Sequence, residues 1–129
     1  MDDPYVALQT VMMPRDANPQ GTIFGGVILS LIDMGGHTGA KHLVVQAGGK
    51  QPVLVTVAVN RVEFKQPVFV GDVVRCMVSL VKFGKTSITI KATIESERGA
   101  EVITVTEAEL VFVNIDNTTR PCSPKPLFG

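Results

Sequence analysis

The hydrophobic and polar positions fall into one helical stretch near the start of the chain and several extended stretches after it. Residues 23–45 carry apolar side chains three to four positions apart, which is the spacing of one face of an α-helix. The positions that set this spacing are Val27, Ile28, Leu31 and Ile32. Because Gly35, Gly36 and Gly39 each cost a helix about 1 kcal/mol relative to alanine, we expect another element to pack very close to it.

The stretches after this helix predict strands. Residues 87–95 alternate between isoleucine or alanine on one face and threonine or lysine on the other, which is typical of a half-buried strand. Three further stretches are rich in β-branched residues and are separated by glycine or proline. They are residues 53–64, 73–83 and 102–113. Most connections are too short for parallel crossovers, so the pattern predicts an α+β domain with an antiparallel sheet.

The two ends of the chain are expected to be extended. Residues 5–13 are mostly apolar and stop at Pro14, and a polar loop then leads to the helix. The tail from Asp116 has three prolines and little pattern, so we expect it to lie over the surface. The prediction is one domain over residues 1–129, with a core over about 5–115 and a tail over 116–129. About five antiparallel strands would wrap around one long central helix, which would explain why the helix carries few charges.

The composition limits the classes of molecule that we expect this protein to bind. Twelve basic and twelve acidic side chains give a formal net charge of zero, so we expect no nucleic-acid partner and no attraction to anionic membranes. Cys76 and Cys122 are too few for a disulfide scaffold and favour a reducing compartment. The first four residues, Met1-Asp2-Asp3-Pro4, are acidic where a signal peptide is basic, and no apolar run reaches about 18 residues. We therefore expect a cytoplasmic protein.

Two glycines, Gly25 and Gly26, stand where the helix is expected to begin. The unbonded N–H groups and the positive end of the helix dipole favour an anion there. Without side chains, the backbone can be approached by a substrate carbonyl, as an oxyanion hole requires. Close packing of the helix against the sheet explains the same glycines, so the sequence leaves both interpretations open.

Asp33 is the only acidic residue between Asp16 and Glu63, and it lies within the predicted helix. Burying an ionised carboxylate is costly unless it is paired or hydrogen-bonded. A carboxylate in a partly dry cleft becomes more basic and can take a proton from water. An aspartate that faces solvent on a polar stripe of the helix fits the pattern equally well.

Ser30 and His37 share that stripe and resemble two members of a hydrolase triad. They are seven residues apart, about 10 Å along a helix axis, which exceeds the hydrogen-bond reach that a serine and its base need. His37 can reach Asp33 at helical spacing, although packing is the more common role for such a histidine. His37 and His42 lie on different helix faces and Cys76 stands alone in a strand, so we expect no metal site.

Several motifs together resemble the hotdog acyl-CoA thioesterases, which include the bacterial acyl-CoA hydrolases and the cytosolic brain-type acyl-CoA hydrolase. The most specific is Asp16-x-Asn18-x-x-Gly21-x-x-Phe24-Gly25-Gly26, followed by Ile32-Asp33-Met34-Gly35-Gly36. Further matches are Val57-Ala58-Val59-x-x-Val62-x-Phe64-x-x-Pro67-Val68-x-Val70-Gly71-Asp72 and Gly84-Lys85-Thr86-Ser87. The resemblance covers residues 11–113.

This resemblance implies a hotdog fold whose subunits pair edge to edge, with active sites at the dimer interface. The family commonly assembles three dimers into a hexamer, so we expect at least a homodimer. Asp33 matches the catalytic acid and Asn18 the loop asparagine, and the family implies that they meet from different subunits. We expect residues 53–60 to form the pairing edge, since such a β-branched edge is otherwise prone to aggregation.

The expected reaction is hydrolysis of an acyl-CoA thioester to free CoA and a carboxylic acid. Gly26 N–H, next to Gly25, would hold the developing oxyanion. Asp33 would activate water as a general base or attack directly to form a mixed anhydride, and Asn18 would orient the water or the carbonyl. We expect no cofactor, because coenzyme A is itself part of the substrate and the product.

Coenzyme A carries phosphates, so cations and hydroxyls are expected where it binds. The candidates are Lys82, Lys85, Thr86 and Ser87, with Arg61 and Lys65 behind them. Each lysine alone is explained as well by an ordinary solvated surface charge.

Two other functions remain open. A hydratase of the same fold, acting on enoyl- or hydroxyacyl-CoA, would need an acid paired with a histidine, and His37 beside Asp33 is the one hint of such a pair. A non-catalytic acyl-CoA binding module would need no general base, which the combination of Asn18, Gly26 and Asp33 argues against. The preferred acyl chain length does not follow from the sequence.

Overall fold

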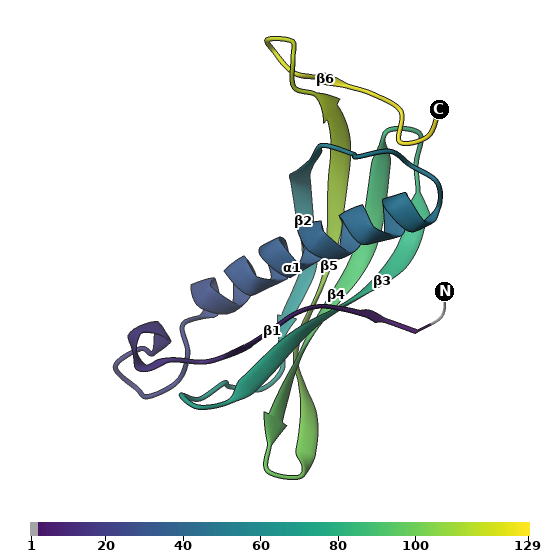
Figure 1. Ribbon diagram of the computed structural model, residues 1–129. Helices are drawn as coiled ribbons and strands as arrows, with labels where there is room; N and C mark the ends of the chain where they lie inside the picture. Colours follow the sequence, from purple (N-terminus) through teal and green to yellow (C-terminus); the bar gives the residue numbers. More distant parts are fainter. Residues whose placement is uncertain (1–2) are drawn as a thin grey trace.

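A five-stranded antiparallel sheet curves around one long helix in the computed structural model, which describes residues 3–129 (Figure 1). Met1 and Asp2, two of the residues behind the expected lack of a signal peptide, lie outside the described residues. The elements in chain order are β1 (Tyr5–Val11), a 3₁₀ turn η1 (Pro14–Asp16), α1 (Gly25–Gln46), β2 (Leu54–Phe64), β3 (Val73–Phe83), β4 (Ser87–Arg98), β5 (Glu101–Asp116) and β6 (Ser123–Pro124). Within residues 3–129, no helix combines the length and the hydropathy needed to cross a bilayer.

The sheet has the strand order β1-β3-β4-β5-β2, and the short β6 pairs with the end of β5. This arrangement confirms the predicted antiparallel sheet around a central helix. The helix begins at Gly25 rather than at Ile23, because the N–H of Ile23 donates to the carbonyl of Val68 and belongs to the preceding loop. β4 and β5 are longer than predicted, since their hairpin continues to pair as far as Arg98 and Glu101.

Glycines bring α1 into direct contact with β3. An ideal Cβ on Gly35 would lie 2.6 Å from the sulfur of Cys76, and one on Gly39 would lie 2.5 Å from the Cβ of Val78. Real Cβ atoms do not come so close, so both positions require glycine. The predicted close packing of this helix is confirmed. The helical propensity that these glycines forfeit, about 1 kcal/mol each, is offset by the contact they permit.

The core lies between the concave face of the sheet and the buried face of α1. Alternate side chains of β4 and β5 point toward the helix, and side chains of β3 complete the layer. The largest fully buried side chains include Phe112, Ile32, Ile88, Ile90, Ile94 and Leu110. Since such cores are close-packed, the sheet holds both ends of the helix in fixed positions.

β2 is an edge strand whose outer side pairs with no described strand. It exposes Val55, Val57 and Val59, and Val57 reaches 55% exposure. Two irregularities interrupt its pairing with β5, and at the second one Arg61 has a positive φ of 54°. An exposed edge of valines is a ready template for another strand.

The tail differs from the prediction of a segment that simply lies over the surface. Leu127 is only 4% exposed and its N–H donates to the carbonyl of Lys85. The side chain of Asn114 holds the tail by donating to the carbonyl of Pro126 and accepting from the N–H of Val53. Residues after Asp116 therefore fold back and close the core beyond the last turn of α1.

Candidate active site

The first turn of α1 presents two backbone donors without partners. Phe24 is the N-cap residue and makes no side-chain cap, and among the described residues Gly25 and Gly26 donate their N–H groups to no acceptor. An ideal Cβ on Gly26 would meet nothing within 4 Å, so the space above this N–H is open. Such donors at the positive end of a helix dipole suit a carbonyl oxygen that gains negative charge.

The loop before the helix is organised by Asn18. Its Oδ1 accepts hydrogen bonds from the N–H groups of Gln20 (2.9 Å) and Thr22 (3.1 Å), and its Nδ2 donates to Thr22 Oγ1 (2.8 Å). The N–H of Phe24 donates to the carbonyl of Asp16 and ties this loop to the helix start. Because a primary amide has two N–H donors, one donor of Asn18 remains for a ligand.

Asp33 lies on the exposed flank of α1 that faces the edge strand. Its Oδ1 accepts a 2.7 Å hydrogen bond from the hydroxyl of Thr56 on β2. The sequence prediction did not include Thr56, which is 23 positions away along the chain. The signal that could have found it is a hydroxyl in an otherwise valine-rich edge strand. The carboxylate is held by one donor and is open to solvent in the single chain.

The other polar side chains of this stripe do not form a triad. Ser30 Oγ donates to the carbonyl of Val27 at 2.8 Å. The ring of His37 packs edge-on against Phe112, with 6.0 Å between centroids, and no described hydrogen bond joins it to Asp33. His42 stacks on Tyr5 of β1 instead. The structure thus separates the two histidines, as their spacing predicted.

One chain does not bring the predicted catalytic groups together. Asp33 follows Gly26 by seven residues, which corresponds to about 10 Å along the helix axis. A group that takes a proton from a reacting water must lie within hydrogen-bond reach of it. A carbonyl bound at Gly26 is therefore too far from Asp33 of the same chain.

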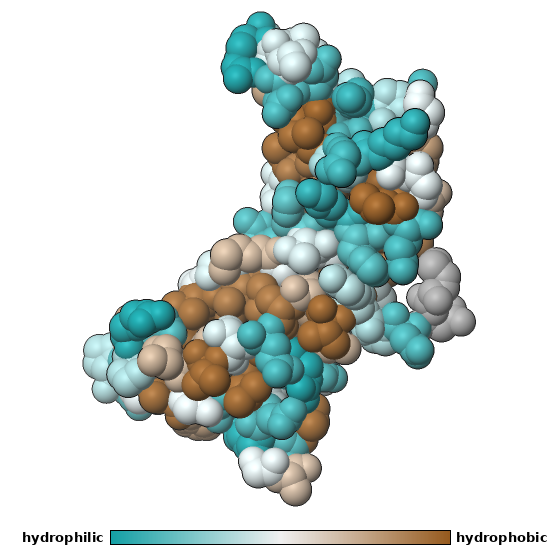
Figure 2. Space-filling model, viewed as in Figure 1, coloured by the Kyte–Doolittle hydropathy of each residue, from teal (hydrophilic) through white to brown (hydrophobic). Residues whose placement is uncertain are grey.

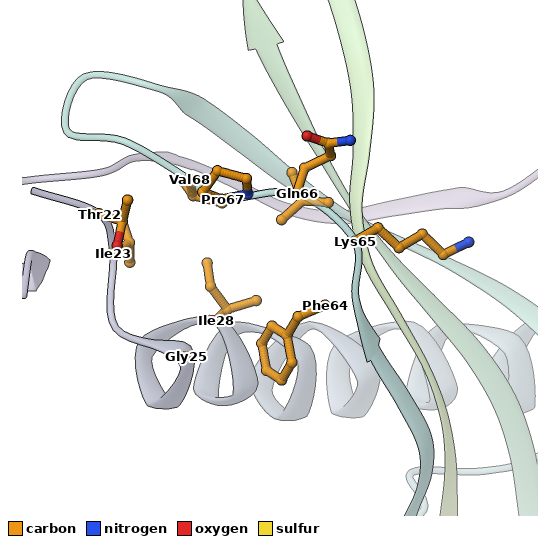
Figure 3. Close-up of a pocket in the computed structure, with 10 residues that line it drawn as sticks. Thr22, Ile23, Gly25, Ile28, Phe64, Lys65, Gln66, Pro67 and Val68 are labelled. Carbon is orange, nitrogen blue, oxygen red and sulfur yellow. The ribbon is translucent and has the colours of Figure 1, made fainter. Parts of the chain in front are cut away.

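A hollow of about 270 Å³ opens beside the helix start. The first turn of α1, the segment before it and the segment that follows β2 form its walls (Figure 3). The ring of Phe64 stands against Gly25, where an ideal Cβ would lie 3.6 Å from the ring. The lining residues are Thr22, Ile23, Gly25, Ile28, Phe64, Lys65, Gln66, Pro67, Val68 and Val105.

The turn proposed for phosphate binding lies at the other end of the helix. Lys85 and Thr86 belong to the turn between β3 and β4, which lies beside the last turn of α1 (Figure 1). The helix has 22 residues and is about 33 Å long. Lys82 and Ser87 flank the turn, at the end of β3 and the start of β4. These four residues are therefore remote from the Gly26 N–H of their own chain.

Arg61 lies on the edge strand β2, and Lys65 follows directly after it. The ammonium of Lys65 lies 2.9 Å from Glu107 Oε1, and this hydrogen bond raises the pKa of Lys65 and lowers the pKa of Glu107. Arg61 lines a separate hollow together with Glu63, Lys91 and acidic residues of β5. Lys65 also lines the hollow beside the helix start, whereas Arg61 does not.

Apolar surface surrounds the first half of α1. Figure 2 shows brown side chains gathered over this part of the helix and the segments beside it. Exposed members are Phe24, Leu29 and Met34, the last at 54% exposure. Met34 lines a hollow together with Val11, Met12 and Met13, on the side of the helix that faces β1.

Known proteins are similar to this chain in sequence and in fold. Residues 20–103 match the family described as Thioesterase superfamily. An acyl-CoA thioester hydrolase named YciA from Salmonella typhimurium is 39% identical over 129 residues, which cover 96% of this chain and 92% of that protein.

Solved structures agree with this match. A hexameric thioesterase from Yersinia pestis superposes with a TM-score of 0.84 at 32% identity, covering 100% of this chain and 99% of that one. A hexameric hotdog-fold thioesterase of Campylobacter jejuni superposes with a TM-score of 0.81 at 35% identity, covering 97% and 90%. The chain therefore belongs to the thioesterase superfamily and has its hotdog fold.

Proposed function

We propose that this protein is an acyl-CoA thioesterase, which hydrolyses the thioester to free CoA and a carboxylic acid. The observation that carries the proposal is the carboxylate of Asp33, held by Thr56 at the open edge of the sheet. Relatives of similar length named as acyl-CoA thioester hydrolases support the choice of substrate.

In the proposed reaction, the N–H of Gly26 donates a hydrogen bond to the thioester carbonyl oxygen and stabilises the oxyanion as it forms. Asp33 removes a proton from water while the water oxygen bonds to the carbonyl carbon. The carbon–sulfur bond then breaks, and the CoA sulfur takes up the proton. In the alternative route, Asp33 attacks the carbonyl carbon itself and water hydrolyses the mixed anhydride. The remaining N–H of Asn18 orients the water or the carbonyl.

The proposed site is shared by two subunits. The distance of about 10 Å along α1 between Gly26 and Asp33 supports a site that takes Asp33 from one chain and Gly26 and Asn18 from another. The exposed valines of β2 support pairing through this edge. Similar proteins described as hexameric support a trimer of such dimers.

The CoA phosphates would contact the turn between β3 and β4 of the partner subunit. Lys82, Lys85 and the hydroxyls of Thr86 and Ser87 offer charge and donors there. A turn at the far end of α1 can reach a site at the helix start when two chains pair with their helices antiparallel. Arg61 and Lys65 would lie behind it, with Lys65 shared between CoA and Glu107.

The geometry favours hydrolysis over the two rival functions. A hydratase needs an acid and a base aimed together at the acyl chain, and His37 packs on Phe112 without a described bond to Asp33. A binding module needs neither a fixed carboxylate nor an open N–H pair. Neither rival accounts for the hydrogen bond that fixes Asp33.

Release of free thiol from a panel of acyl-CoAs tests the proposal. The wild-type protein should release thiol, and Asp33→Asn should lower kcat by about 100-fold or more, because a general base contributes about that much. Asp3→Asn, which alters another exposed carboxylate, serves as the matched control and should behave as wild type. Binding of acyl-CoA without thiol release would replace the thioesterase with the binding module.

A further inference from the structure

The hollow beside Gly25 has a buried floor made only of aliphatic side chains. Ile23, Ile28, Val68 and Val105 are 7%, 2%, 2% and 1% exposed, respectively. None of the ten described residues that line the hollow is a buried polar side chain. A ligand that carried a polar group to this floor would leave it without a hydrogen bond, at a cost of about 1–3 kcal/mol.

The polar residues of the hollow stand at its rim. Thr22 is half-buried, and Lys65 and Gln66 are exposed. Figure 3 shows the Lys65 side chain extending away from the floor, and its ammonium is engaged with Glu107. The hollow thus has a polar, solvent-exposed entrance and a buried apolar floor. This arrangement suits a ligand that is polar at one end and hydrocarbon at the other.

Phe64 forms one wall of the hollow, beside the first turn of the helix. Its side chain is 53% exposed, although an exposed phenylalanine forfeits burial worth about 1.5–3 kcal/mol. The ring packs against Gly25, where an ideal Cβ would lie 3.6 Å from Cζ, an ordinary van der Waals contact. An acyl chain whose carbonyl oxygen meets Gly26 N–H would pass along this ring.

The floor is held in place from two sides. The N–H of Ile23 donates to the carbonyl of Val68. Arg98 donates to the carbonyl of Pro67 and to Asp72 Oδ2, and its guanidinium covers the ring of Phe69. Because the segment after β2 is fixed in this way, the floor should not yield to an acyl chain that is too long.

We propose that this hollow is the acyl-chain subsite and that Phe64 determines the preferred chain length; this inference rests on the proposed thioesterase function. Its volume of about 270 Å³ equals that of about nine waters at ~30 Å³ each, and a methylene is similar in size to a water. The subsite therefore takes short- to medium-chain acyl groups without polar substituents.

The test compares kcat/KM across straight-chain acyl-CoAs for the wild type and Phe64→Ala. In the wild type, each methylene that enters the hollow should raise kcat/KM up to about fourfold, and the rise should end before about ten carbons. In Phe64→Ala the wall made by the ring is lost, so a longer chain can extend past it out of the hollow. The ratio of kcat/KM for hexadecanoyl-CoA to that for hexanoyl-CoA should therefore increase by about tenfold or more.

Val102→Ala is the matched control, because Val102 is 54% exposed and lies near the hairpin tip between β4 and β5. It should leave the ratio unchanged, and Phe64→Leu should give an intermediate ratio. Dissociation constants of the same acyl-CoAs with Asp33→Asn and with Asp33→Asn/Phe64→Ala provide a readout without turnover and should show the same shift.

The outcomes separate the two proposals. Thiol release with the same chain-length profile in the wild type and Phe64→Ala overturns the subsite while the thioesterase stands. Fastest hydrolysis of hexadecanoyl-CoA by the wild type also overturns the subsite. No thiol release from any acyl-CoA overturns the thioesterase, and the subsite is then also overturned unless the dissociation constants shift as expected.

Discussion

The hydroxyl of Thr56 donates a 2.7 Å hydrogen bond to Asp33 Oδ1 and so joins the middle of α1 to the edge strand β2. The bond fixes the carboxylate beside β2, which is one of the two edge strands of the described sheet. The position of the proposed base is therefore coupled to the strand proposed for dimer pairing.

Removal of this hydroxyl should impair turnover more than substrate binding. In Thr56→Val the carboxylate loses its fixed orientation, so kcat should fall by about tenfold with a small change in KM. Thr56→Ser restores the hydroxyl and should recover most of the rate. Steady-state thiol release measures both parameters, and an unchanged kcat in Thr56→Val would show that the bond is only structural.

Gly26→Ala should separate stability from activity. The added Cβ meets nothing within 4 Å, and alanine is favoured over glycine in a helix by up to about 1 kcal/mol. The urea midpoint should therefore stay equal or rise. The methyl group obstructs the approach of a carbonyl to the N–H, so kcat/KM should fall by about 100-fold. Full activity in this variant would remove Gly26 from the proposed oxyanion site.

Much of the fold follows from local patterns in the sequence. The glycines at 35 and 39 indicated close packing, and the structure places them against Cys76 and Val78. The Asp33–Thr56 bond did not follow, because it depends on strand register. A register irregularity lies directly after Thr56, and a shift of one residue turns every side chain to the opposite face. The burial of Leu127 did not follow either, because a single apolar residue in a proline-rich tail forms no periodic pattern that would indicate a buried face.

A charge on the exposed edge of β2 should weaken assembly. Val57 is 55% exposed, and Val57→Lys places like charges opposite or near each other when two copies of this strand pair. Light scattering coupled to size exclusion should show smaller particles than the wild type at equal concentration. Val102→Lys alters an equally exposed valine near a hairpin tip and should assemble normally. Wild-type assembly of Val57→Lys would place the pairing surface elsewhere.

The two cysteines should differ in reactivity. Burial raises the pKa of the Cys76 thiol to about 12, whereas Cys122 is exposed. Because the thiolate is the reactive form, an aromatic disulfide reagent at pH 8 should modify Cys122 in the native protein and Cys76 only after unfolding. Rapid modification of both thiols in the native protein would contradict this prediction. Cys122 must also be blocked before free CoA is measured with such a reagent.

The same shift makes stability depend on pH. The native state keeps the Cys76 proton up to a pKa of about 12, while the unfolded chain loses it near pH 8.5. The unfolded state then binds fewer protons, so the free energy of unfolding should decrease as pH rises from about 8.5 toward 12. Urea midpoints should fall less steeply over this range in Cys76→Ala than in the wild type.

If one active site combines Asp33 of one subunit with Gly26 of its partner, as proposed, then two variants that are each inactive should complement one another. Asp33→Asn and Gly26→Ala are each expected to be nearly inactive. Dissociating and reassembling them in equal amounts should form mixed dimers with one intact site, and random pairing in a two-fold dimer then restores about a quarter of wild-type thiol release. Recovery near that level supports the shared site. Mixed dimers, verified by mass spectrometry, that stay as inactive as the parent variants would show that each chain builds its site alone.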